Sequence, residues 1–181
     1  MKKAAVFFAL GFEEVEALTQ VDLLRRAGID VDMVSITDET SVFGAHNIEV
    51  VCDEILEEID KDSYDALILP GGMPGTKNLG NCSELIEMLK KYNEEGKIVA
   101  AICAAPMVLG RNGILEGKKA CCYPGFEEFL EGAEVCEDKV AADGNVITSR
   151  GVGTAIEFAG ALIEALVGKD AADEVKESII Y

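Results

Sequence analysis

Tryptophan is absent from this chain of 181 residues, and histidine occurs once, as His46. Positive charge is also scarce, because 16 lysines and arginines stand against 34 aspartates and glutamates and give a formal net charge of −18. Such a surface lacks the basic stripe that nucleic acids and anionic membranes require. No apolar run is long enough to span a bilayer. We therefore expect neither a nucleic acid nor a membrane as a partner, and we expect no metal site and no other cofactor.

The six cysteines, at positions 52, 82, 103, 121, 122 and 136, show no paired-ligand spacing. The first apolar run, Ala4 to Leu10, is short for a secretory signal, and no small-residue cleavage site follows it. A buried first strand explains this run better, so we expect free thiols in a cytoplasmic protein. Cys121 and Cys122 are neighbours on an expected strand, where their side chains point to opposite faces and do not readily hold one metal ion.

Short apolar runs alternate with longer amphipathic stretches, and 49% of the residues are hydrophobic, which predicts one globular domain over residues 1–181. Strands are expected at Ala4–Ala9, Val31–Ile36, Tyr64–Leu69, Ile98–Ile102, Lys119–Cys122, Lys139–Ala141 and Asn145–Thr148, with an Asp143-Gly144 turn between the last two. Helices are expected at Glu13–Ala27, Ser83–Glu95 (capped by Asn81 or Ser83), Ala104–Asn112, Gly125–Leu130, Thr154–Val167 and Ala171–Ser178. Apolar strands separated by helices predict an α/β fold, with a mostly parallel sheet covered by helices on both faces.

Cys103 is the most informative single residue. It lies in Lys97-Ile-Val-Ala-Ala-Ile-Cys-Ala-Ala-Pro106, where a buried strand runs into small residues and the start of a helix. This pattern is typical of the sharp strand-to-helix turn that holds the nucleophile of hydrolases. Unpaired amides and the helix dipole favour a thiolate there, so we expect a lowered pKa and a reactive sulfur. The alternative is a buried cysteine that acts as a small apolar core residue.

Two further segments follow strand ends, and sites in parallel sheets form outside the carboxyl ends of the strands. Leu10-Gly-Phe-Glu-Glu-Val-Glu16 would bring a carboxyl group to Cys103. Glu16 flanks the apolar stripe of its helix, so desolvation should raise its pKa, unless it is an ordinary first-turn glutamate. Leu69-Pro-Gly-Gly-Met-Pro-Gly75 would bring backbone amides, because Gly71 and Gly72 let the main chain approach a sulfur or an oxyanion, unless the segment is a plain turn.

His46 and Tyr123 are weaker candidates. His46 would be the natural base for Cys103 if the two met, but Phe43-Gly-Ala-His-Asn47 is typical of an exposed loop or hairpin. Tyr123 precedes a proline and either packs or orients a substrate through its hydroxyl group. The segment Gly151-Val-Gly153 lacks the third glycine of a dinucleotide-binding fingerprint.

Five segments resemble the ThiJ/PfpI superfamily, and within it the DJ-one (parkinsonism-protein) branch, in both order and spacing. They are Gly11-Phe-Glu-Glu-Val-Glu16, Val21-Asp-Leu-Leu-Arg-Arg-Ala-Gly28, Tyr64-Asp-Ala-Leu-Ile-Leu-Pro-Gly-Gly72, Ala100-Ala-Ile-Cys-Ala-Ala-Pro106 and Thr148-Ser-Arg-Gly-Val-Gly-Thr154. The resemblance covers essentially the whole chain and implies a flavodoxin-like three-layer sandwich. It also implies a homodimer, with the first helix around Arg25 and Arg26 and the segment His46–Cys52 at or near the contact.

The resemblance assigns site residues as well. The family cysteine falls on Cys103 and its protonated glutamate on Glu16. The oxyanion or sulfinate contacts of the family fall on the backbone amides of Gly72 and Ala104. Two residues, Arg26 and His46, fall where relatives place polar groups near the pocket or the dimer contact.

One position departs from the family pattern, because Tyr123 stands where many relatives carry a histidine near the cysteine. A Cys-His-acid protease triad then cannot be assembled in the usual way, and a peptidase is disfavoured. The resemblance implies instead a glutathione-independent glyoxalase or deglycase, acting on 2-oxoaldehydes such as methylglyoxal or on glycated protein. The alternative is a non-enzymatic oxidative-stress sensor or chaperone in which Cys103 is oxidised to a sulfinate. A third possibility is a small-molecule binding protein with an inert cysteine.

Overall fold

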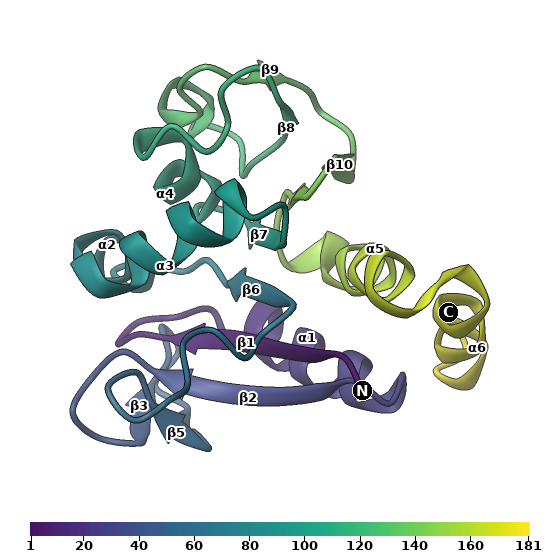
Figure 1. Cartoon of the computed structure of the whole chain (residues 1–181), viewed down its shortest axis with the longest axis horizontal. Helices are drawn as coiled ribbons and strands as arrows, with labels where there is room; N and C mark the ends of the chain where they lie inside the picture. The colour runs from purple at the N-terminus through teal and green to yellow at the C-terminus, as the bar shows by residue number, and fades with distance from the viewer.

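A computed structural model describes residues 1–181 and contains a seven-stranded sheet in the order β10-β11-β7-β6-β1-β2-β5 (Figure 1). Its strands are β1 (Lys3–Phe8), β2 (Asp30–Ser35), β5 (Glu54–Ile55), β6 (Ala66–Leu69), β7 (Ile98–Ile102), β10 (Val140–Asp143) and β11 (Val146–Ser149). All neighbours in the sheet are parallel except β10 and β11, which are joined at the Asp143-Gly144 turn. The mostly parallel sheet and this turn are as the sequence predicts. The predicted strands of the sheet end within two residues of the observed ones, and the short β5 was not predicted.

Six helices cover the two faces of this sheet. They are α1 (Glu14–Arg26), α2 (Gly75–Asn81), α3 (Ser83–Glu94), α4 (Pro106–Arg111), α5 (Ala155–Val167) and α6 (Lys169–Ser178). Helices α1, α5 and α6 pack on one face, and α2, α3 and α4 pack on the other, on the opposite side of β6 and β7 from α5 and α6 (Figure 1). Strand β1 supplies both cores, because its side chains alternate between the faces. The three-layer sandwich is therefore confirmed.

Two smaller strand pairs lie outside the main sheet. The hairpin of β3 (Ser41–Phe43) and β4 (Glu49–Val51) carries His46 in its turn, as an exposed hairpin was expected to. Its main chain is tied to the loop after β1, because Gly11 N–H donates to the Phe43 oxygen at 2.8 Å and Ala45 N–H donates to the Phe12 oxygen at 2.7 Å. The other pair, β8 (Lys119–Ala120) and β9 (Glu134–Val135), is parallel.

Several local expectations were wrong at segment ends. Helix α4 begins at Pro106 rather than Ala104, because Cys103 and the two alanines after it form a turn and the proline takes the first helical position. The segment expected as a helix at Gly125–Leu130 contains only a short 3-10 turn, Glu127–Phe129. The residue that caps α3 is Cys82, without a side-chain hydrogen bond, so neither Asn81 nor Ser83 has that role.

Helix α2 was not predicted at all. The glycines and prolines of Leu69–Gly75 favour a turn, and a turn is present, but α2 follows it directly from Pro74. The glycine-rich loop therefore has a rigid element on each side, β6 before it and α2 after it. Every helix of the structure is too short or too polar to cross a membrane.

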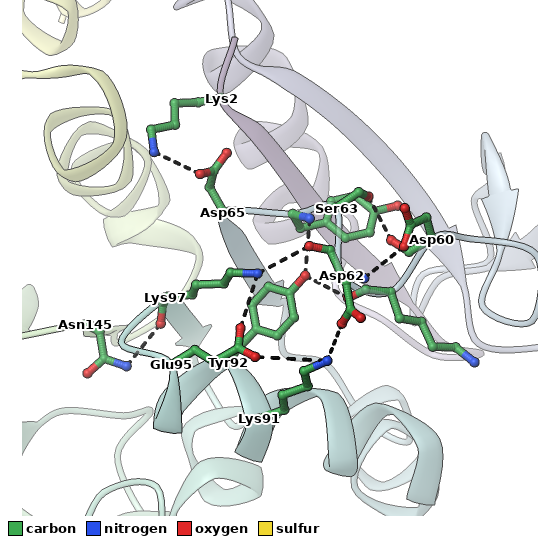
Figure 2. Close-up of polar contacts among 12 residues, drawn as sticks. Lys2, Asp60, Asp62, Ser63, Asp65, Lys91, Tyr92, Glu95, Lys97 and Asn145 are labelled. Carbon is green, nitrogen blue, oxygen red and sulfur yellow. Dashed lines mark hydrogen bonds and ion pairs between the residues drawn. The ribbon is translucent and has the colours of Figure 1, made fainter.

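The amino ends of the central strands are closed by polar contacts between the residues that precede them (Figure 2). Lys2, before β1, bonds Asp65, before β6, at 2.8 Å. Asn145, before β11, donates to the oxygen of Lys97, before β7, at 3.0 Å. The most buried member of this group is Tyr92 of α3, whose side chain is 0% exposed.

The Tyr92 hydroxyl donates to the Lys61 oxygen at 2.7 Å and accepts the Tyr64 N–H at 3.2 Å. It therefore satisfies two main-chain groups next to the start of β6, in addition to packing in the core. Exposed ion pairs around it contribute little to stability by comparison. With the amino edge of the sheet closed in this way, the loops at the carboxyl edge are the ones left to form a site.

Candidate active site

Cys103 follows the last residue of β7 and has a backbone φ of +66°. This left-handed conformation is uncommon for a residue with a β-carbon and is stabilised only by its surroundings. Here the Cys103 N–H donates to the Ser149 oxygen at 3.0 Å, and the Tyr123 N–H donates to the Cys103 oxygen at 2.8 Å. The sharp strand-to-helix turn that the sequence predicts is confirmed, and main-chain bonds on both sides hold it in place.

Glu16 lies in the first turn of α1 and is 0% exposed. Its Oε2 accepts the Gly71 N–H at 2.9 Å, while Oε1 is buried without a nitrogen or oxygen partner. The Cys103 thiol lies beside this carboxyl group, because a β-carbon on Gly71 would be 2.7 Å from Glu16 Oε2 and 3.1 Å from the Cys103 sulfur. The Glu16 N–H in turn donates to Oε2 of Glu13, the residue that caps α1, at 2.7 Å. The convergence of Glu16 and Cys103 that the topology predicts is therefore present.

Gly71 and Gly72 allow the main chain to approach this pair closely. A β-carbon on Gly71 would lie 2.6 Å from the β-carbon of Cys103 and 2.7 Å from Oε2 of Glu16. Gly72 has a φ of +89°, which a residue with a side chain rarely adopts. Its backbone amide and that of Ala104 lie near the Cys103 sulfur and lower the pKa of the thiol. The loop is therefore more than a plain turn, and both amides expected near the sulfur are there.

The pKa of Glu16 is raised from 4.5 to about 7, mainly because burial disfavours its charged form. Hydrogen bonds from Cys103 and the Gly71 amide lower the pKa, and the Glu13 carboxylate raises it. The expected rise is thus found. At neutral pH this carboxyl group is divided between its protonated and charged forms, which suits a group that both accepts and returns a proton.

The expected fall in the pKa of Cys103 is wrong. Burial raises it to about 12, and the Glu16 carboxylate raises it further, while the amides of Ala104 and Gly72 lower it. The reason is that α4 begins only at Pro106, so the helix dipole acts from a distance, whereas the loss of water acts directly on the sulfur. Cys103 therefore keeps its proton at neutral pH and needs a base, and Glu16 is the group in contact with it.

A cavity of about 550 Å³ opens above this pair. Tyr123, 51% exposed, forms part of its wall, and its hydroxyl group is free to face a ligand. The lining residues are Glu13, Glu16, His46, Gly72, Cys103, Tyr123, Pro124, Arg150, Gly151, Val152, Gly153 and Thr154. Glu13, Pro124 and the five residues from Arg150 to Thr154 were not singled out as site residues. The signal that could have found the last five is the Thr148–Thr154 segment, which was used as evidence of family and weighed only as a dinucleotide fingerprint.

His46 lies on the rim of this cavity with its side chain 68% exposed. Its Nδ1 is 2.7 Å from Oε2 of Glu14, and its backbone N–H donates to Oε1 of the same residue at 2.6 Å. The Glu14 carboxylate raises the pKa of His46. Ligand atoms of Glu13, Glu14 and His46 lie within 4.8 Å of one another, the spacing of a metal site. In this structure, however, both Glu14 oxygens are already bound by His46.

Arg26 does not line the cavity, so of its two expected places the one near the pocket is wrong, and the one near the dimer contact stays a prediction. It is at the end of α1, ten residues beyond Glu16, which is about 15 Å along a helix. Its Nε donates instead to Asp22 of the preceding turn at 2.8 Å.

The sequence model of the DJ-1/PfpI family matches residues 2–165 of the chain. Protein DJ-1 homolog B of Arabidopsis thaliana is 43% identical over 99% of this chain, which spans only 41% of that protein. Protein dj-1beta of Drosophila melanogaster is 37% identical over 99% of this chain and 97% of its own length. The solved structure of Toxoplasma gondii DJ-1 in an oxidised form has a TM-score of 0.96 and 36% identity, covering 100% of this chain and 99% of that one. The chain thus resembles the Drosophila and Toxoplasma proteins over nearly their whole length.

The contact between Gly71 and the Cys103–Glu16 pair can be tested with Gly71→Ala. The added methyl group overlaps two atoms that the fold holds in place, so we expect a loss of about 1–3 kcal/mol in the free energy of unfolding, measured with urea. Gly153→Ala is the matched control, because a β-carbon there meets nothing within 4 Å. Equal stability of the two variants would contradict the geometry.

The raised pKa of Glu16 predicts a pH dependence of stability. The folded carboxyl group binds its proton more tightly than the unfolded one, so its contribution is full below pH 4.5 and is lost as the pH rises to about 7. The loss is about 3 kcal/mol, at about 1.4 kcal/mol for each pKa unit. Glu16→Gln removes this slope, so relative to wild type its stability should increase from pH 4.5 to 7 and level off above. Parallel curves for the two proteins would refute the shift, and Glu87→Gln on the exposed face of α3 is the control.

Proposed function

The chain belongs to the DJ-1/PfpI family, and from that membership and its buried Cys103–Glu16 pair we propose that it is a cysteine-dependent, glutathione-independent glyoxalase or deglycase. Its substrates would be 2-oxoaldehydes such as methylglyoxal, or the adducts that these form on proteins. The observation that carries the proposal is a carboxyl group with a pKa of about 7 in contact with a thiol that has no other base beside it. No cofactor is part of the proposal.

In the first step the Glu16 carboxylate takes the proton of the Cys103 thiol as the sulfur adds to the aldehyde carbon. A carbon–sulfur bond forms, the carbonyl π bond breaks, and the oxygen takes up a proton to give a hemithioacetal. The backbone amides of Gly72 and Ala104 lie beside the sulfur and would stabilise the charge that develops in the transition state. Because the pKa of the Cys103 thiol is about 12, the sulfur is not a thiolate before the reaction begins. The addition therefore needs a base, and Glu16 has that role.

In the second step Glu16 moves a proton from the former aldehyde carbon to the neighbouring carbonyl group. The electrons of the broken C–H bond form an enediol, and its collapse gives the thioester of a 2-hydroxy acid. Water then displaces the Cys103 sulfur, which recovers its proton, and the 2-hydroxy acid leaves. A group that repeatedly accepts and returns a proton works best with a pKa near the working pH, as Glu16 has.

The cavity fits this substrate class. Its volume of about 550 Å³ is generous for an aldehyde of a few carbons, and it leaves room for a side chain that carries an adduct. Tyr123 lines the wall, and His46 bonds Glu14 rather than Cys103. The proposal therefore uses Glu16, and not a histidine, as the base for Cys103.

The test is lactate formation from methylglyoxal by purified protein without glutathione. Cys103→Ser should abolish turnover, and Glu16→Gln should lower it by about 10²–10⁴-fold, the scale for losing a general acid or base. The glutamine keeps the shape and a donor but exchanges no proton. Tyr123→Phe is the matched control at the same cavity and should keep most of the activity. Equal rates in wild type and Cys103→Ser would exclude this function.

The second candidate is a redox sensor without turnover. The two backbone amides at the sulfur and a protonated Glu16 would hold the oxygens of a sulfinate as well as an oxyanion. A sensor would gain two oxygens at Cys103 under mild peroxide, and Glu16→Gln would keep much of this behaviour because the amide still donates. Peptide mapping distinguishes the two functions together with the lactate assay, and an unmodified Cys103 would exclude the sensor.

We also propose a homodimer, built on exposed apolar side chains of three connected segments. These side chains belong to Leu10, Val15, Leu18, Phe43, Ile48 and Val51. The segments are joined by the Gly11–Phe43 and Ala45–Phe12 main-chain bonds and by the Glu14–His46 pair. A second copy that covers this surface would also lie against His46, on the rim of the cavity, and would help to close it.

Val51→Glu tests the dimer, because Val51 is 64% exposed in one chain and a charge there would be buried without a partner in an interface. We expect wild type to sediment as a dimer at micromolar concentration and Val51→Glu to shift toward the monomer. Val167→Glu is the matched control, because it makes the same substitution at an exposed valine at the end of α5, outside the three segments, and this variant should stay dimeric. A monomeric wild type would overturn the proposal.

A further inference from the structure

Cys121 and Cys136 directly follow the last paired residues of β8 and β9. In this parallel pair Ala120 is opposite Val135, and the Cys136 N–H continues the pairing by donating to the Ala120 oxygen at 2.9 Å. One further step of the same register places Cys121 opposite Cys136. Figure 1 shows the two strands near β10, at the end of the molecule away from β1 and β2. All six cysteines of the chain are free in this structure.

The two thiols project from the same face of the pair. Lys119 forms an ion pair with Asp138 at 2.6 Å, and the Asp138 carboxylate also accepts the Cys136 thiol. Lys119 and Cys136 therefore share a face, and Cys121, two residues after Lys119, projects from it too. The pKa of Cys121 supports this placement, since it is raised chiefly by burial and then by the Cys136 thiol.

The spacing of the pair suits a covalent bond. Neighbouring strands lie about 4.8 Å apart, and the α-carbons of bridged cysteines lie about 4.4–6.8 Å apart. The Cys121 N–H makes no main-chain bond to β9, because it donates instead to Oγ1 of Thr148 at 2.9 Å. The Cys121 sulfur lies 3.4 Å from the Thr148 oxygen and 3.7 Å from the Thr148 hydroxyl, and a thiol is a weak hydrogen-bonding group, so these contacts are readily given up.

We propose that Cys121 and Cys136 form a reversible disulfide when the protein meets hydrogen peroxide. Cys136 is partly exposed and Cys121 is fully buried, so the peroxide reaches Cys136 first. A sulfur–oxygen bond forms there, the peroxide O–O bond breaks, and water leaves with the thiol proton. The Cys121 sulfur then attacks the Cys136 sulfur, the sulfur–oxygen bond breaks, and the departing hydroxide takes the Cys121 proton as a second water.

The disulfide closes the segment of residues 122–135, and this segment is one wall of the cavity at Cys103. Tyr123 and Pro124 line that wall, and the Tyr123 N–H holds the Cys103 oxygen. Oxidation therefore tethers the wall at both ends and restricts its motion without touching Cys103. The Cys121–Cys136 disulfide does not depend on the proposed activity, because it forms whether or not the Cys103 site turns over an aldehyde.

To test it, fully reduced protein is treated with hydrogen peroxide, free thiols are blocked, and the chain is cut without reductant by a protease specific for glutamate. Cleavage at Glu127 to Glu134 separates Cys136 from Cys121. We expect a linked peptide pair that dithiothreitol separates, in a protein that has lost two hydrogens. We also expect the native oxidised protein to be cut more slowly after Glu127 than the reduced one. Equal cleavage rates would contradict the restricted wall.

Single substitutions identify the partners. Cys121→Ala and Cys136→Ser should lose the link, and the partly exposed Cys136 site keeps the test valid if Cys121→Ala fails to fold. Cys122→Ala is the matched control and should keep the link, because the Cys122 side chain points away from Cys121 and packs in the core with α2, α3 and α4. Cys103→Ser should also keep it, so that failure of the disulfide and failure of the proposed activity are told apart. Six free thiols in peroxide-treated wild type, or a lost link in Cys122→Ala, would overturn the proposal.

Discussion

The contact between the Glu16 carboxyl group and the Cys103 sulfur is the interaction on which the rest of the site depends. Burial makes both charged forms costly, so the pKa of each group is raised and one proton can pass between them. The contact exists only because Gly71 has no side chain and because Cys103 is held in a left-handed conformation. The buried carboxyl group and the left-handed conformation of Cys103 are each unfavourable alone, and the surrounding main-chain hydrogen bonds stabilise both.

The two edges of the sheet have different roles, because contacts at the amino edge stabilise the fold and segments at the carboxyl edge form the candidate site. At the amino edge of the sheet, Tyr92 and the contacts around it satisfy the main-chain groups that precede the strands (Figure 2). At the carboxyl edge, the start of α1 after β1 carries Glu16, and the turns after β6 and β7 carry the two glycines and Cys103. These loops meet because parallel strands place their carboxyl ends side by side. The same arrangement leaves His46 and Tyr123 on the rim, where they face a ligand without bonding to the sulfur.

Much of this was predictable from the sequence. Ile98–Ile102 is a run of apolar residues that only a buried strand accommodates, and its end identified the turn at Cys103. The position of Glu16 beside the apolar stripe of α1 predicted a raised pKa, since the stripe shows which face is buried. By contrast, the sequence did not predict α2, because the glycines and prolines before it favour a turn and only packing on the sheet stabilises the helix.

By itself the sequence determined the mostly parallel sheet, most of its strands and helices, and the candidate pair of Cys103 and Glu16, because short-range periodicity shows which segments are buried and where the strands end. The tertiary structure alone decided the protonation of Cys103, since burial outweighs a helix that begins three residues later. It also decided that Arg26 bonds Asp22 outside the cavity, and that β8 and β9 pair just before Cys121 and Cys136. These outcomes depend on which distant segments exclude water from each other and in what register they pair, and neither is encoded in any local run of residues.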